Sequence, residues 1–190
     1  MAFGVPDEGI AQVDDAPSLA GVIDIHAHAA PETAMMNFKR AFDAIEAAQI
    51  ARIYGMRGIV LKEHHTETAS WAYLVSQMVP GVEVFGGIVL NKAVGGINPV
   101  AVEAMALSRG GRGRVVYMPT VDAAARVPNS PNAVAVSRNG QLLPETLDVL
   151  KVIAKHDLGL STGHVSAEEA LMVIRAAKAA GVNKLCSTAI

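Results

Sequence analysis

The apolar run Val22–Ile25, followed at once by His26-Ala27-His28, constrains this chain more than any other stretch. A short β-branched run is typical of a buried strand. Side chains at i and i+2 of a strand share a face, so we expect His26 and His28 to project side by side. Two neutral imidazoles held in this way can bind one metal ion, although an idle surface pair is the alternative.

Similar runs recur along the chain and alternate with helical patterns. The expected strands are Val22–Ile25, Gly58–Leu61, Val82–Leu90, Arg114–Met118, Leu158–Thr162 and Lys184–Ser187. The expected helices are one within 38–56, then Thr68–Val79, Asn98–Ser108, Pro144–His156 and Ser166–Gly181. Such alternation predicts an α/β fold with a parallel sheet. Histidines rather than a glycine-rich phosphate loop follow the first strand, which favours a barrel of the TIM type over an open doubly wound sheet.

The strand count predicts an incomplete barrel. An eight-unit barrel typically needs about 250 residues, whereas this chain has 190 and offers about six of the eight strands. We therefore expect a C-terminally truncated barrel domain over residues 21–190, after a flexible arm over residues 1–20. An uncovered strand edge makes a homo-oligomer an expected consequence.

The segment Val121–Leu143 interrupts the regular alternation of strands and helices and is predicted to form a long loop. It holds Pro128, Asn129, Pro131, Asn132 and Gly140, and it follows the fourth expected strand. Loops of this length are usually functional or mobile, so a lid or substrate contact over the barrel mouth and a disordered insertion are both open.

Composition excludes several classes of partner. The net charge is −2, and the chain has no basic run, which argues against nucleic acid. No apolar run is long enough for a membrane span. The first residues are acidic rather than a signal peptide, and Cys186 is the one cysteine, so we expect a cytoplasmic protein that acts on a small-molecule substrate.

Two further polar clusters follow expected strands. At Lys62-Glu63-His64-His65, alternation places Lys62 and His64 on one face, and we expect that face to line the mouth. Lys62 would hold an anionic group or stabilise negative charge, and His64 would be a ligand or a general acid/base, unless the strand end is merely solvated. His164, in the turn after the fifth strand, is the expected third metal ligand, although a place beside a helix N-cap is its ordinary alternative.

The segments GVIDIHAHAAPE, VLKEHHTET, VYMPTVDA and LSTGHVSAEEALMVIRAAKAAGV resemble the amidohydrolase superfamily of metal-dependent hydrolases, and in particular a poorly characterised bacterial branch. The resemblance implies a distorted TIM-type barrel whose metal activates water to attack an amide, ester or lactone. It implies that His26, His28 and His164 hold the metal. The bridging lysine or glutamate on strand four, the strand-six histidine and the strand-eight aspartate of that superfamily have no counterpart here.

The sequence therefore predicts a hydrolase with one divalent ion, zinc first, with iron or manganese as alternatives. Lys62 and His64 would be its catalytic residues. Two alternatives remain open, namely a non-catalytic remnant that binds metal weakly or packs on a partner, and a phosphoesterase of the PHP-like barrel type.

Overall fold

The computed structural model describes residues 18–33, 35 and 39–187, and so the arm predicted for residues 1–20 lies mostly outside the described residues. Six parallel strands form one sheet in the order β1-β2-β3-β4-β7-β8. These strands are β1 (Ile23–Ala27), β2 (Gly58–Leu61), β3 (Glu83–Val89), β4 (Gly113–Tyr117), β7 (Gly159–Ser161) and β8 (Lys184–Cys186). All six predicted strands are confirmed.

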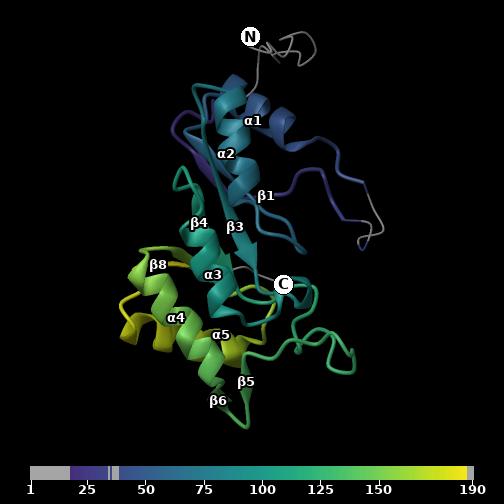
Figure 1. The fold of residues 1–190 in the computed structure, drawn as a ribbon, viewed down its shortest axis with the longest axis vertical. Coiled ribbons are helices and arrows are strands. Elements are labelled where there is room, and N and C mark those ends of the chain that lie inside the picture. The colour runs from purple at the N-terminus through teal and green to yellow at the C-terminus, as the bar shows by residue number, and fades with distance from the viewer. Residues whose placement is uncertain (1–17, 34, 36–38, 188–190) are drawn as a thin grey trace.

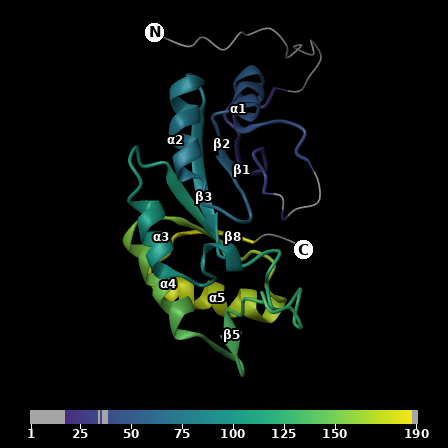
Figure 2. The same cartoon turned by 45° about the vertical axis from the view of Figure 1, so that its right-hand side comes forward.

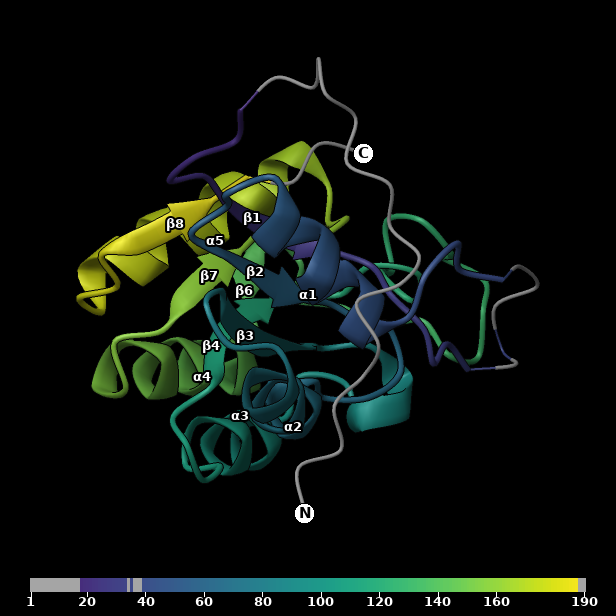
Figure 3. The ribbon, with the colours of Figure 1, turned by 90° about the horizontal axis from the view of Figure 1, so that it is seen from above.

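The helices alternate with these strands. They are α1 (Ala44–Ile53), α2 (Ala69–Met78), α3 (Pro99–Ala106), α4 (Pro144–Lys155) and α5 (Ala167–Ala179), with a 3-10 turn, η1 (Lys92–Val94). The caps follow local chemistry, because Asp43 and Ser166 each form a capping box with the glutamate three residues on. The predicted α/β half-barrel is confirmed, with the strands curled and the helices on their convex side (Figures 1 and 3).

Two apolar clusters join the helices to the sheet. One packs α1 and α2 against β2 and β3 through small side chains such as Ala48 and Ala72. The other packs α3, α4 and α5 against β3, β4 and β7 around Val116, Leu150 and Leu160. Figure 2 shows α3, α4 and α5 gathered below the pair α1 and α2. Every helix therefore covers the same outer face, which leaves the concave face to the strands' inward side chains.

The segment predicted as a long loop contains structure of its own. A short antiparallel hairpin, β5 (Ser137–Arg138) and β6 (Gln141–Leu142), turns at Asn139-Gly140. Both turn residues have positive φ, of 52° and 73°, which is the backbone of a type I′ hairpin turn. Val136 is buried in the apolar cluster of α3 to α5. This part of the segment is thus packed rather than disordered.

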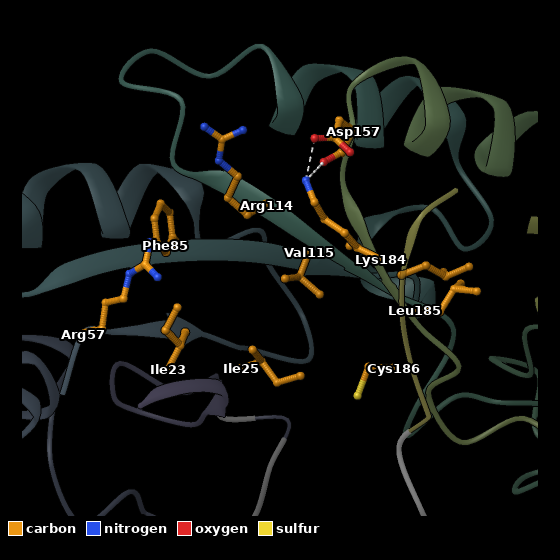
Figure 4. A pocket seen from close by; sticks show the side chains of 12 residues that line it. Ile23, Ile25, Arg57, Phe85, Arg114, Val115, Asp157, Lys184, Leu185 and Cys186 are labelled. Atoms are coloured by element: carbon orange, nitrogen blue, oxygen red, sulfur yellow. Dashed lines mark hydrogen bonds and ion pairs between the residues drawn. The ribbon is translucent and has the colours of Figure 1, made fainter. Parts of the chain in front are cut away.

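The concave face has an apolar hollow near the amino ends of the strands (Figure 4). Its volume is about 520 Å³. It is lined by Ile23 and Ile25 of β1, by Phe85 and Val115 in the middle of the sheet, and by Cys186 of β8. The sheet therefore curls far enough for its two outer strands to line one space. No helix of the described residues is long and apolar enough to cross a membrane.

Candidate functional site

Polar side chains fill the opposite end of the concave face, where five neighbouring strands terminate. Each strand contributes from its last residues or the loop that follows. The contributors are His26 and His28 from β1, Lys62, Glu63 and His64 from β2, Asn91 from β3, Thr120 from β4 and His164 from β7. Their convergence follows from the parallel order, because carboxyl ends of parallel strands lie at one edge.

A β-bulge aims the first histidine inward. Asp24 pairs with Ile59 and Ala27 pairs with Leu61, so three residue steps on β1 span two steps on β2. The extra residue shifts the alternation of faces. Asp24 is exposed, and its carboxylate accepts a hydrogen bond from the His26 main-chain N–H at 2.8 Å. Unbroken alternation would place Asp24 on the same face as the histidines. Its carboxylate instead accepts from the backbone of the bulge.

His26 and His28 lie against each other and against Lys62. Their Nε2 atoms are 3.2 Å apart, and the Lys62 ammonium lies 3.0 Å from the Nε2 of His26. On the far side of His28, an Arg40 guanidinium nitrogen lies 3.1 Å from Nδ1. Lysine and arginine can only donate hydrogen bonds, so His26 accepts at Nε2 and His28 accepts at Nδ1. Neutral His28 then carries its proton on Nε2, pointing at His26.

The local charges keep these imidazoles neutral. Burial, together with the charges of Lys62 and Arg40, lowers the pKa of His28 to about 3. Burial and then Lys62 also lower the pKa of His26, against a smaller opposing effect of Asp24. The pKa of Lys62 is lowered to about 8 by burial and by the charge of Arg40, so Lys62 is still mostly protonated at neutral pH. The imidazoles are thus neutral, and their lone pairs accept from Lys62 at His26 and from Arg40 at His28.

His64 is held in a buried hydrogen-bond network. Its Nδ1 lies 2.8 Å from the hydroxyl of Thr120, which also accepts from the Asn91 amide at 2.9 Å. The Asn91 amide donates to the His64 carbonyl as well. The His64 ring centre is 4.8 Å from that of His28. Burial and the nearby Lys62 lower the pKa of His64 to about 2, which makes it a fixed neutral imidazole.

Glu63 is the fully buried carboxylate at this end, with 1% of its surface exposed. One oxygen accepts from the His64 main-chain N–H at 2.7 Å and lies 3.5 Å from Nδ1 of His65. The other lies 3.9 Å from the Arg40 guanidinium. The side chains of this segment alternate as predicted. Lys62 and His64 contact the β1 histidines, whereas Glu63 and His65 contact each other.

His164 is placed by an unusual turn. Gly163 has a φ of 62°, and a Cβ there would lie 2.2 Å from the main-chain oxygen of Met118. The His164 main-chain N–H donates to the Pro119 oxygen at 2.8 Å. The Nδ1 of His164 is buried without a hydrogen-bond partner. The pKa of His164 is lowered by burial and then by Lys62, and His164 in turn acts on the pKa of His26, so both belong to one electrostatic cluster.

Imidazole nitrogens such as those of His26, His28 and His164 are common metal ligands, and two of these nitrogens also lie at a distance that suits one ion. Zn–N bonds of about 2.0–2.1 Å at the tetrahedral angle set their two nitrogens about 3.3 Å apart, close to the 3.2 Å between the Nε2 atoms of His26 and His28. In the described part of the chain, no three His, Cys, Asp or Glu side chains are grouped so that they could hold an ion. Binding through both Nε2 atoms therefore requires Lys62 to release His26, and it requires His28 to move its proton from Nε2 to Nδ1 as Arg40 withdraws. A third donor must also approach.

Three residues at this end were not predicted from the sequence. Asn91 and Thr120 each follow an apolar strand directly, and both are almost fully buried. That position was the signal that could have found them. Arg40 precedes α1 in an irregular segment and carries no such signal. Its place beside His28 and Glu63 is set by tertiary contacts that no local sequence pattern encodes.

These features define an α/β half-barrel with a cluster of imidazoles and cations at the carboxyl ends of its strands. The chain belongs to a family of unknown function, DUF6282, whose model matches residues 21–189. No curated protein is significantly similar to it.

Proposed function

We propose that the chain is a metal-dependent hydrolase of the amidohydrolase type, with His26, His28 and His164 as ligands of one divalent ion, zinc first. The observation that carries this proposal is the pair of neutral imidazoles with Nε2 atoms 3.2 Å apart. The buried, unpartnered Nδ1 of His164 in the same cluster supports it, because a buried nitrogen without a partner is costly unless a ligand satisfies it.

A bound metal would polarise a carbonyl and lower the pKa of a water molecule toward about 7. The chain's own residues have separate tasks in this proposal. The Lys62 ammonium, 2% exposed, faces the β1 histidines and would stabilise negative charge on the substrate. His64 would orient the substrate or pass on a proton, since Thr120 and Asn91 fix its ring.

Tyr117 completes the floor of the site. Its hydroxyl donates to the Ile25 main-chain oxygen at 2.5 Å, and its ring centre lies 6.0 Å from that of His26. The Lys62 ammonium is 5.1 Å from the ring centre. Burial raises the pKa of Tyr117, so the phenol stays protonated and continues to donate. The ring separates the polar end from the apolar hollow and would keep water out of that side.

The test is metal content per chain, measured by elemental analysis on monodisperse protein after gel filtration. We expect about one ion per chain for the unaltered protein and most of it lost in His164→Ala and in His26→Ala. His156→Ala is the matched control, because His156 ends α4 on the outer layer and contacts Glu103. Full metal content in His164→Ala would contradict the assignment. A metal-free unaltered chain would favour the non-catalytic alternative.

A further inference from the structure

Lys62 carries a buried positive charge at the carboxyl end of the sheet. Lys62 is almost fully buried, and within the described residues no carboxylate lies within 4.0 Å of its ammonium. The ammonium lies 3.0 Å from Nε2 of the neutral His26 ring. The charge of Glu63 acts on Lys62 without touching it, and a buried ammonium with no carboxylate in contact is unfavourable, so an anionic group beside Lys62 would be favoured.

A second permanent cation stands beside it. Arg40 lies 3.1 Å from His28 and 3.9 Å from Glu63, and its charge is one of the causes that lower the pKa of Lys62. Glu63 is already shared between a main-chain N–H, His65 and Arg40. The two cations therefore lie on either side of the β1 pair, Lys62 against His26 and Arg40 against His28, and their positive charges act on each other.

We propose that the substrate carries an anionic oxygen group, a carboxylate or a phosphate, which Lys62 and Arg40 bind together beside His26 and His28. The proposal rests on the proposed function in placing a substrate at this site. Arginine offers a planar pair of donors that suits either group, and lysine adds a point charge. A neutral amide or ester without such a group would leave the Lys62 charge uncompensated.

The test is calorimetric titration of the full chain in buffer containing EDTA, at constant ionic strength. Succinate and inorganic phosphate are the anionic probes, and succinamide is the neutral analogue of succinate. We expect at least one anion to bind at least tenfold more tightly than succinamide. Lys62→Met and Arg40→Gln should each weaken that binding at least tenfold. Lys178→Met, an exposed lysine on the outer helix α5, should leave it unchanged.

The comparison of the two anions identifies the group, and tighter binding of either supports the proposal. Equal binding of succinamide, no binding of either anion, or unweakened binding by both variants would overturn it. Arg40→Gln serves alone if Lys62→Met does not fold. Because the titration is done without metal, its result is separate from metal content. His164→Ala that loses metal yet still binds the anion would uphold both ideas, whereas anion binding by a chain that never holds metal would uphold this one alone.

Discussion

The two ends of the same six strands contrast sharply. At the carboxyl ends, buried polar groups hydrogen-bond to one another: Glu63 accepts from the main chain of the adjacent His64, and Asn91 donates to the His64 carbonyl from the next strand. At the amino ends, the concave face is open and mainly apolar, with Ile23 and Ile25 39% and 42% exposed. The charged residues Arg57, Arg114, Asp157 and Lys184 also line this hollow (Figure 4). The difference indicates that the backbone supplies one curved support, while the last residues of each strand decide which end carries the buried polar cluster. Substitutions at the carboxyl ends should therefore cost far more stability than those at the amino ends.

The largest effect is expected at the turn that places His164. Gly163→Ala requires a left-handed backbone, which costs about 1–2 kcal/mol, and it drives a Cβ into the Met118 and Pro119 main-chain oxygens. We expect a total loss of about 4 kcal/mol or more in the free energy of unfolding, measured by urea titration. Gly140→Ala is the matched control, because Gly140 also has positive φ but nothing within 4 Å of the added Cβ. A similar, small loss in both variants would show that the turn relaxes without cost.

The next effect compares two glutamates at opposite ends. Glu63→Gln removes a buried charge that faces Arg40 and accepts from the His64 main chain. Breaking a buried pair costs about 3 kcal/mol. Glu83→Gln removes an exposed partner of Arg112 at the amino end, and we expect a loss of about 0–1 kcal/mol. Urea unfolding of both variants measures the difference, and equal losses would contradict the contrast between the two ends.

A pH dependence should separate the ends further. His64 has a pKa of about 2 in the folded chain, against an ordinary value of 6.5. As the pH falls below about 6.5, the unfolded chain binds a proton that the folded chain refuses, so stability falls on acidification. One such histidine contributes up to about 1.4 kcal/mol per pH unit.

Unfolding at pH 6.5, 5.5 and 4.5 in EDTA measures this slope. His64→Asn keeps a polar group near Thr120 and removes the titration, so we expect a shallower fall. An unchanged slope in that variant would show that other groups cause the acid sensitivity.

The smallest effect is expected in the apolar hollow. Ile25→Thr replaces a half-exposed side chain with a smaller β-branched one, and we expect a change of less than about 1 kcal/mol in unfolding free energy. A loss above about 2 kcal/mol, measured by the same urea titration, would show that Ile25 is covered in solution, because a side chain that stays in water cannot contribute that much.

The strands could be predicted from the sequence because each one is a short β-branched run bounded by strong signals. Gly58–Leu61 was predicted to the residue. The β5–β6 hairpin was missed, although Asn139-Gly140 is a strong local turn signal, because its strands are only two residues long. Sequence periodicity predicts which face of the sheet a side chain occupies only if the alternation along the strand is unbroken. The bulge after Asp24 breaks that alternation and could not be predicted from the sequence.

The candidate site was predictable in part for a related reason. Histidines at the ends of predicted strands point to a shared mouth once the sheet is known to be parallel, and this located His26, His28, His64 and His164. Arg40 could not be predicted because its contact with His28 is a tertiary one, with no strand end or periodic pattern to mark it. The metal itself stays a prediction, and so do the catalytic roles of Lys62 and His64.

The hydrogen bond from Tyr117 to Ile25 has a consequence for how accurately the site is built. It joins β4 to β1 directly, although β2 and β3 lie between them in the sheet. Each ladder between neighbouring strands fixes their relative twist only within a tolerance, and small angular errors accumulate over three ladders. One cross-bond over the concave face cancels that accumulation. The distance between the β1 histidines and β4 is then set by the length of one tyrosine side chain. It no longer depends on the summed twist of three strand ladders.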